Sequence, residues 1–165
     1  MNWYVLYCLS HRTNRILSNL RRRSEIEAFI PESEVYHRDS KEITKKPMFD
    51  HYIFVKTTLE QKEFNDLLLT MRDENDGLIK QLENNETSAL RKEEIEFFET
   101  VLDENHIVRI SYGYKLHGKT MITEGPLLAY QNHIARVDTH NHTAHLDLTF
   151  FDRKIVVGIC ITGKK

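Results

Sequence analysis

The sequence contains only two cysteines among its 165 residues, Cys8 and Cys160, and they lie near opposite ends of the chain. Two such distant thiols do not make the repeated spacing of a disulfide framework or a structural metal site. No apolar run approaches the roughly 18–20 residues that cross a bilayer. The N-terminal residues also lack the basic lead and small-residue cleavage site of a signal peptide. These absences predict a cytoplasmic protein with reduced thiols and no membrane attachment.

Motifs typical of an enzyme are also missing. The chain has no glycine-rich phosphate loop, no nucleophile elbow centred on serine and no complete set of metal ligands. The acidic cluster Glu93-Glu94-Glu96 lies on a predicted helix and is better explained as a solvated face. We therefore expect a protein without enzymatic activity, without a cofactor and without a bound metal.

The composition is that of a folded chain with an uneven charge distribution. Apolar residues make up 40% and charged residues 29%, which excludes a disordered or fibrous protein. The net charge is −2, yet residues 11–23 carry five arginines and no acidic residue. Residues 57–105, by contrast, carry five basic and fourteen acidic residues. The basic segment is either a local contact for nucleic acid or a solvated helix face.

The first hundred residues alternate between apolar runs and helical patterns. Runs at residues 3–9 and 52–55 predict buried strands, and residues 28–36, interrupted or ended near Pro31, and residues 78–82 are two further strand candidates. Apolar side chains recur at helical spacing within residues 16–20, 64–71 and 95–102. The order β-α-β-β-α-β-α predicts an α+β domain in which helices cover a small, mostly antiparallel sheet. We place this domain at residues 1–105.

Turn and cap residues refine this picture. Ser10 and Ser88 are expected to cap the first and third helices, and Thr58 with Gln61 has the spacing of a capping box for the second. The polar stretch from His37 to Lys46 is expected to form the tip of a hairpin.

The pattern changes near His106. From Tyr114 onward the chain shows no helical periodicity. About fifty residues of short strands predict a small SH3-like β-barrel at residues 114–165, after a linker at residues 106–113. The strand candidates are residues 121–123, 133–137, 144–150 and 154–157.

Motifs in both halves of the chain resemble one family. Trp3-Tyr-Val-Leu-Tyr-Cys8 is followed by the basic segment and by Lys46-Pro-Met-Phe-Asp-His-Tyr-Ile-Phe-Val55. This combination resembles the N-terminal domain of the NusG family of transcription elongation factors, which carries Trp-Tyr-Val and Lys-Pro-Leu-Phe-Pro-Gly-Tyr-Val-Phe-Val there. The run from Gly118 to Asp138 resembles the KOW motif of the same family. The motifs occur in the family's order, so the resemblance covers nearly the whole chain.

Finer features point to specialised members of that family. Residues 103–114 and 151–158 are most similar to the LoaP-type operon-specific antiterminators, and the N-terminal run is also similar to RfaH. Two places depart from the family pattern. Asp50-His51 stands where Pro-Gly is usual, and Ala129 and Asn132 stand where the KOW loop usually has glycine. Both departures put the fine geometry of a loop in doubt, because glycine alone accepts a positive φ freely.

The resemblance implies two binding surfaces on the N-terminal domain. The family's aromatic pocket grips the clamp helices of the RNA polymerase β′ subunit, and the matching positions here are Tyr7, Phe49, Tyr52 and Phe54. Tyr52 and Phe54 share one strand face, and aromatic residues are favoured anchors of interfaces. A core role is the alternative for all four. The basic helix implies contact with non-template or upstream DNA through Arg12, Arg15, Arg22 and Arg23.

The barrel carries a weaker nucleic-acid signal. LoaP-type proteins are rich in basic residues where this chain has Asp138-Thr-His140-Asn-His142. His140, His142 and His145 are either solvent-facing strand ends or an incomplete metal site that lacks a cysteine or acidic partner. The remaining candidate contacts for nascent RNA are Lys115, Lys119, Arg136, Arg153 and Lys154.

The function expected from the resemblance is a monomeric, specialised antitermination factor that suppresses pausing and termination. Its barrel would recruit nascent leader RNA or a termination or ribosomal protein. Two alternatives stay open. One is a general NusG-like elongation factor with a protein-binding barrel. The other is a KOW-type RNA-binding module of the translation machinery. The four aromatic residues that match the polymerase-binding pocket argue against this second alternative.

Overall fold

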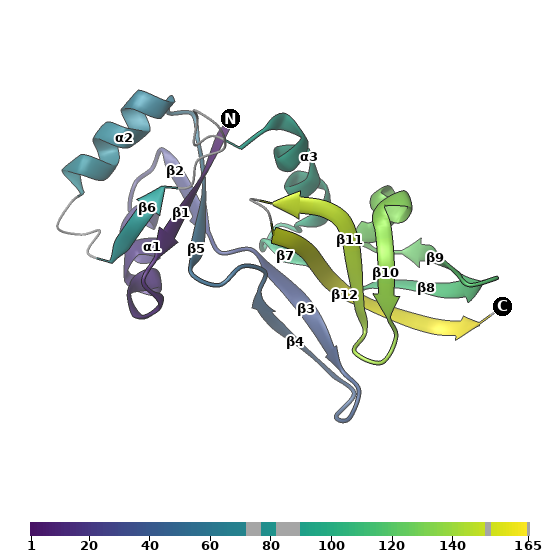
Figure 1. Cartoon of the computed structure of the whole chain (residues 1–165). Helices are drawn as coiled ribbons and strands as arrows, with labels where there is room; N and C mark the ends of the chain where they lie inside the picture. The colour runs from purple at the N-terminus through teal and green to yellow at the C-terminus, as the bar shows by residue number, and fades with distance from the viewer. Residues whose placement is uncertain (72–76, 82–89, 151–152, 165) are drawn as a thin grey trace. The chain divides into compact units, whose positions relative to one another are not determined.

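The computed structural model describes residues 1–71, 77–81, 90–150 and 153–164 (Figure 1). Contacts divide the chain into two compact units. Unit 1 contains residues 1–30 and 49–95, and unit 2 contains residues 31–48 and 96–165. The segment after Ile30 therefore belongs to the same unit as the C-terminal half, whereas the domain boundaries at residues 105 and 114 stay a prediction. None of the helices in the described part has the length and apolar character to cross a membrane.

Unit 1 is built on a four-stranded antiparallel sheet in the order β2-β5-β1-β6. The predicted strands at residues 3–9 and 52–55 form its centre, because both are apolar on both faces and so fit a position covered on both sides. The elements are β1 (Asn2–Cys8), η1 (Ser10–Arg12), α1 (Thr13–Arg21), β2 (Ile26–Phe29), β5 (Tyr52–Thr57), α2 (Gln61–Thr70) and β6 (Leu78–Gln81).

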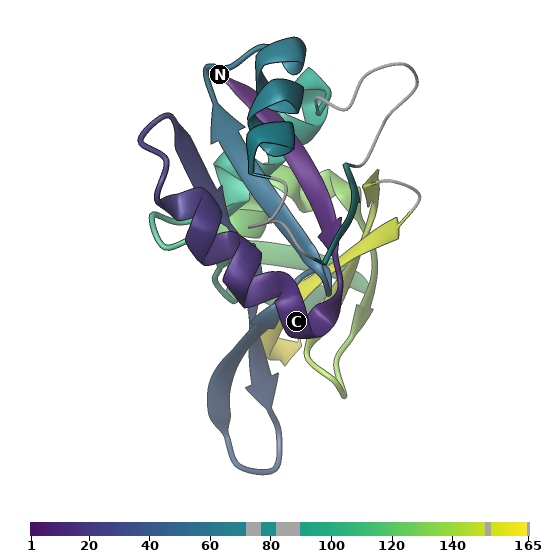
Figure 2. The ribbon, with the colours of Figure 1, turned by 90° about the vertical axis from the view of Figure 1, so that its left-hand side faces the viewer.

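Helices α1 and α2 cover one face of this sheet (Figures 1 and 2). Their apolar stripes meet the strand residues that point to the same side, and the Tyr4 and Phe64 rings stack at 4.4 Å. Cys8 lies in this core as a free thiol, and burial raises its pKa to about 12. The main side chains of the core are Tyr4, Leu6, Cys8, Ile16, Leu17, Leu20, Ile53, Val55, Phe64 and Met71.

The helix starts differ from the predicted caps. Ser10 begins the 3-10 turn η1, and α1 starts after Arg12 with no side-chain cap. The capping box of α2 uses Glu60 and Glu63 rather than Thr58 and Gln61. The cap expected at Ser88 lies outside the described residues.

Unit 2 contains a hairpin that is longer than the sequence predicts. Residues 38–41 form the tip of the hairpin, within the segment expected for it, whereas residues 42–46 of that segment belong to the second strand. β3 pairs antiparallel with β4 and parallel with β7, so residues 106–113 hold a strand and the start of another. The elements of this three-stranded sheet are β3 (Glu32–His37), β4 (Glu42–Pro47) and β7 (Ile107–Val108).

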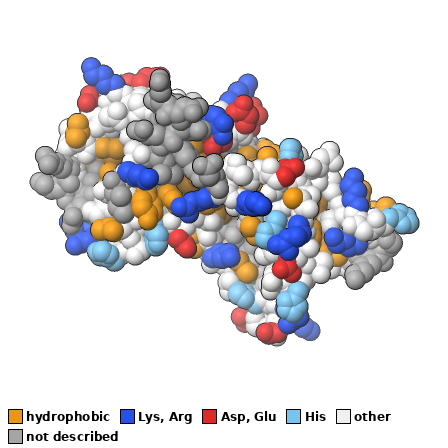
Figure 3. All heavy atoms as spheres, viewed as in Figure 1, with side chains coloured by type: hydrophobic (Ala, Val, Ile, Leu, Met, Phe, Trp, Pro, Cys, Tyr) orange, Lys and Arg blue, Asp and Glu red, His pale blue; other side chains and the backbone are white. Residues whose placement is uncertain are grey.

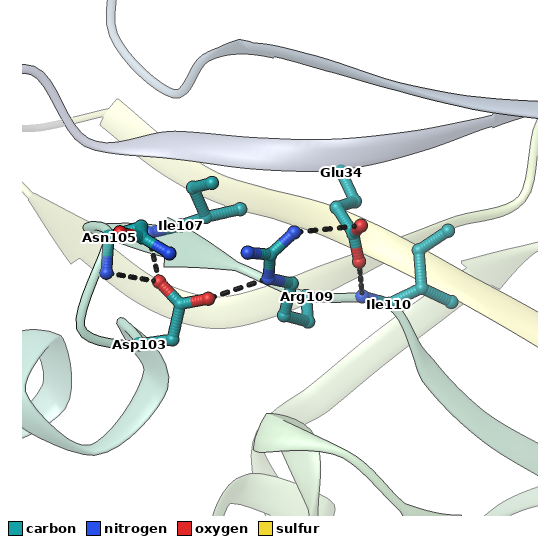
Figure 4. A network of polar contacts seen from close by, with 6 residues as sticks. All are labelled: Glu34, Asp103, Asn105, Ile107, Arg109 and Ile110. Atoms are coloured by element: carbon teal, nitrogen blue, oxygen red, sulfur yellow. Dashed lines mark hydrogen bonds and ion pairs between the residues drawn. The ribbon is translucent and has the colours of Figure 1, made fainter.

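A polar network holds β3 beside the chain that leaves α3 (Lys92–Val101). The Arg109 guanidinium donates to Asp103 at 2.6 Å and to Glu34 at 3.2 Å, while the other Glu34 oxygen accepts the Ile110 N–H at 2.9 Å (Figure 4). Burial alone would raise the pKa of Asp103, but hydrogen bonds from Ile107, Arg109 and Asn105 outweigh it and lower the pKa. The network thereby links Glu34 to Arg109, which is 75 residues further along the chain.

The C-terminal half of unit 2 is a curled five-stranded sheet in the order β10-β11-β12-β8-β9. This half-barrel, together with the helix-covered sheet of unit 1, confirms the predicted α+β fold class. The Phe98 ring of α3 meets Phe150 of the sheet at 5.3 Å. The elements are β8 (Ser111–Leu116), β9 (Lys119–Glu124), η2 (Pro126–His133), β10 (Ile134–Asp138), β11 (Thr143–Phe150) and β12 (Arg153–Lys164).

The two departures from the family pattern have separate outcomes. Ala129 and Asn132 lie inside η2, and neither has a positive φ. His51, in contrast, has a φ of 73°. A left-handed residue other than glycine costs roughly 1–2 kcal/mol, so the chain keeps the turn at residue 51 at an energetic cost.

Candidate functional site

The face of the unit 1 sheet opposite α1 and α2 is aromatic. Side chains alternate along strands, so Trp3 and Tyr7 point away from the Tyr4 and Leu6 side of β1. Tyr7 lies directly opposite Tyr52 in the register of β1 and β5. We name the aromatic face by its six members, which are Trp3, Tyr7, Phe29, Phe49, Tyr52 and Phe54.

The four predicted polymerase-binding residues come together on this face. The rings of Tyr7 and Tyr52 lie 5.1 Å apart, and those of Phe49 and Phe54 stack at 6.2 Å. Tyr7 is half-buried, Tyr52 and Phe49 are each 5% exposed, and Phe54 is 0% exposed. Tyr7 is therefore the member that solvent reaches most, while Phe54 supports the others by packing. Their role in binding stays a prediction.

Sequence reasoning missed two members of the aromatic face. Trp3 and Phe29 meet edge to face at 5.7 Å, and the Lys56 ammonium lies 4.7 Å from the centre of the Trp3 ring. Such an ammonium is attracted to the negative face of an aromatic ring. The alternation Trp3, Val5, Tyr7 within β1 is the signal that places Trp3 on the same side as Tyr7.

The arginines of the basic segment have different environments. Arg15 and Arg22 are exposed and seven residues apart, so they lie on one side of the helix. The aliphatic stem of Arg12 lies against Gly77. A methyl group added at Gly77 would lie 2.4 Å from the Cβ of Arg12. Arg23 is half-buried, and Asn19 is buried. Of the four arginines predicted to contact DNA, Arg15 and Arg22 are therefore the exposed ones.

Three of the five predicted basic residues of the C-terminal half line one groove. Lys115, Lys119 and Arg136 surround a space of about 370 Å³ together with His117 and Gln131. Arg153 and Lys154 do not line this groove; they are exposed at the start of β12. The groove offers cationic donors to an anionic partner, and the role of all five residues stays a prediction.

The three histidines suggested as a metal site have three separate partners. His140 Nδ1 lies 2.7 Å from Arg38, the His142 ring lies 4.5 Å from Tyr36, and His145 Nε2 lies 3.0 Å from Arg136. Within the part of the chain that is described, no three histidine, cysteine or acidic side chains gather around a common point suited to a metal.

His145 is expected to make folding stability depend on pH. Arginine stays protonated and donates, so His145 Nε2 accepts from Arg136 and the ring is neutral. Burial is the first cause that lowers the pKa of His145, followed by the positive charges of Arg136 and Lys154, against the opposing charge of Asp138. The folded pKa is below the unfolded value of roughly 6.5, so this stability is present above that pH and is lost as pH falls through the folded pKa.

We therefore expect a lower urea midpoint at pH 5.5 than at pH 7.5, and a smaller difference between the two in His145→Gln. His11→Gln, at an exposed histidine of unit 1, is the matched control. An unchanged pH dependence in His145→Gln would contradict this assignment.

The described residues form an aromatic sheet face, an arginine-bearing helix and a cationic groove. Such features are typical of proteins that bind macromolecules. The family described as transcription termination factor NusG matches residues 1–99, which is more than half of the chain. The chain therefore belongs to the NusG family of non-enzymatic transcription elongation and antitermination factors, which bind RNA polymerase. A search of curated proteins finds no match.

Proposed function

We propose that this chain is a specialised antitermination factor. It binds the clamp helices of the polymerase β′ subunit through Tyr7, Phe49, Tyr52 and Phe54, and it suppresses pausing and termination on particular operons. The observation that carries this proposal is the cross-strand pair of Tyr7 and Tyr52 on the sheet face opposite α1 and α2, where Tyr7 is only half-buried. Rigid aromatic side chains clustered in this way are the usual anchors of a protein interface.

The proposed mechanism is differential binding to two states of the polymerase. The aromatic face docks on the clamp helices, and Arg12, Arg15, Arg22 and Arg23 contact non-template or upstream DNA. Together these contacts favour the elongating state over the paused state. A ligand shifts such an equilibrium only by its difference in affinity for the two states, and about 1.4 kcal/mol of difference is a tenfold shift. Modest contacts are therefore enough to suppress pausing.

The specialised role rests on the C-terminal half. The similarity of residues 103–114 and 151–158 to LoaP-type antiterminators supports operon-specific recruitment. The groove lined by Lys115, Lys119 and Arg136 supports contact with nascent RNA. Arg153 and Lys154 add exposed positive charge in the same unit. In this scheme residues 1–105 bind the polymerase, and residues 114–165 recruit the RNA.

Replacing Tyr7 by alanine is expected to weaken binding to a clamp-helix fragment about 10-fold or more, because truncating a central aromatic anchor removes a hot spot. Tyr7 suits this test because it is half-buried, whereas Phe54 is 0% exposed and its removal would damage the fold. Binding is measured by titration calorimetry with the full chain. Leu69→Ala, at a side chain 69% exposed on α2, is the control. Equal affinities of Tyr7→Ala and the wild type would contradict the proposed interface.

The double variant Arg15→Ala, Arg22→Ala is expected to bind single-stranded DNA more weakly and with less dependence on salt. Each lost phosphate contact lowers the slope of log K against log salt by about 0.7 on a single strand, so two contacts lower it by about 1.4. The slope is measured by fluorescence anisotropy between 50 and 200 mM salt. Lys62→Ala removes an exposed charge from α2 and is expected to leave the slope unchanged. A double variant with the wild-type slope would exclude this helix from DNA binding.

A further inference from the structure

A second groove lies within unit 2, between the β3–β4 hairpin and the turn that joins β10 to β11. Its volume is about 550 Å³, which is within the range of small ligand sites. We call it the hairpin groove. The polar and aromatic side chains that line it and enter the argument are Tyr36, His37, Arg38, Asp39, Lys46 and His140.

The groove presents nitrogen donors and positive charge. The Arg38 guanidinium is always protonated, so it donates to His140 Nδ1 at 2.7 Å. This bond places the His140 proton on Nε2, which is a further donor. Asp39 lies 3.9 Å from Arg38, but its side chain is fully exposed, and such pairs are weak. With Lys46 the groove therefore matches the acceptor oxygens of a phosphodiester.

An aromatic wall accompanies these cations. The Tyr36 ring lines the groove and meets the His142 ring at 4.5 Å with an angle of 68° between their planes. Aromatic rings next to a cationic track are how proteins hold single-stranded nucleic acid, because every base can stack on them. An acidic peptide would use Arg38 and Lys46 but would leave the face of Tyr36 without a matching group.

The same turn connects the hairpin groove with the cationic groove of the proposed function. Arg136 lines the cationic groove. His140, four residues further along the chain, lines the hairpin groove. Four extended residues span at most roughly 14 Å, so a short strand of RNA can contact both grooves. Figure 3 shows Lys, Arg and His side chains over the β3–β4 and β10–β11 hairpins, with acidic side chains among them at the tip of the β3–β4 hairpin.

We infer that the hairpin groove binds single-stranded RNA, with Arg38 and Lys46 on phosphates and Tyr36 stacked on a base. This inference rests on the proposed function in that nascent RNA is the strand available to a factor on the polymerase. It adds the β3–β4 hairpin, which precedes the C-terminal half in the sequence, to the RNA-contacting surface.

The test measures anisotropy of the full chain with a labelled, unstructured 12-nucleotide RNA. Arg38→Ala and Lys46→Ala are each expected to weaken binding about 5-fold and to reduce its salt dependence. Tyr36→Leu keeps an apolar side chain and is expected to weaken binding about 5-fold or more with the salt slope unchanged. Lys62→Ala is the control, because Lys62 is an exposed lysine of α2 in unit 1 and does not line the groove.

Two outcomes would overturn the inference. Equal losses in Lys62→Ala and Lys46→Ala would mean that RNA is attracted to exposed lysines in general. Tighter binding of a poly-glutamate peptide than of RNA would mean an acidic protein partner. Clamp-helix binding by the same variants separates this inference from the proposed function. Arg38→Ala is expected to bind the clamp fragment as the wild type does, and Tyr7→Ala is expected to bind the RNA as the wild type does, so either proposal can fail alone.

Discussion

Replacing Phe64 by alanine is expected to lower the free energy of unfolding by about 3–5 kcal/mol, the cost of removing a fully buried aromatic ring. Phe64 is 0% exposed on α2, and its ring stacks on Tyr4 at 4.4 Å with 8° between the planes. The Tyr4 hydroxyl donates to the Leu59 carbonyl at 3.0 Å, which fixes the ring in place. Because β1 is held in place and cannot move into the space that the Phe64 ring leaves, a cavity remains under the helix.

Urea unfolding followed by tryptophan fluorescence measures this loss, since Trp3 is the single tryptophan and lies in the same unit. The midpoint is expected to fall with an unchanged slope. Leu69→Ala is the control on the same helix, where a side chain 69% exposed is expected to contribute less than about 0.5 kcal/mol. A Phe64→Ala midpoint within error of that control would mean that α2 does not pack on β1 in solution.

The sequence predicts well the helix faces and buried strands, because these depend on local periodicity. Ile16, Leu17 and Leu20 were expected on one helix face, and they are 0%, 8% and 0% exposed. The apolar run at β1 and the run at β5 formed central strands for the same reason, because a segment apolar on both faces must be covered on both. Side-chain spacing of this kind is fixed by helix and strand geometry and needs no knowledge of distant residues.

Features that depend on distant residues could not be predicted in this way. The β3–β4 hairpin joins the C-terminal half through Glu34 and Arg109, which are 75 residues apart and carry no common motif. The cap of α2 is Glu60 rather than Thr58, because the helix begins at Gln61 and the residue directly before it holds the cap position. η2 has no apolar period, and Gln131 holds it by bonding to the backbone of β9.

In the candidate site, too, local spacing predicts which residues share a face, whereas their burial depends on distant residues. Tyr52 and Phe54 were expected to share a face, and the register confirms that Tyr7 joins them as the direct neighbour of Tyr52. The depth of each ring depends on packing, so the 0% exposure of Phe54 could not be read from its spacing. The same limit applies to Arg12, whose stem lies against Gly77, a residue 65 positions away. Accessibility, which decides what a partner touches, is a property of the folded chain.

Replacing Gly158 by alanine is expected to cost roughly 2–3 kcal/mol of stability, because the added methyl group has no room. Its Cβ would lie 2.4 Å from the Glu34 carbonyl oxygen and 3.1 Å from Ile110 Cγ1. Neither neighbour can withdraw easily, since the Glu34 carboxylate holds the Ile110 N–H at 2.9 Å and also binds Arg109. β12 must therefore move away from β3, which loosens the attachment of the β3–β4 hairpin.

Gly118→Asn is the matched substitution, since a Cβ at Gly118 meets nothing within 4 Å and asparagine accepts the φ of 80° there. In urea unfolding followed by circular dichroism, Gly158→Ala is expected to have a much lower midpoint than Gly118→Asn. Hydrogen exchange of β3 and β12 amides is expected to accelerate only in Gly158→Ala. Equal stability of the two variants would mean that β3 does not contact β12 at this glycine. The RNA surface proposed for the β3–β4 hairpin would then lack the support that close packing of β3 on β12 gives it.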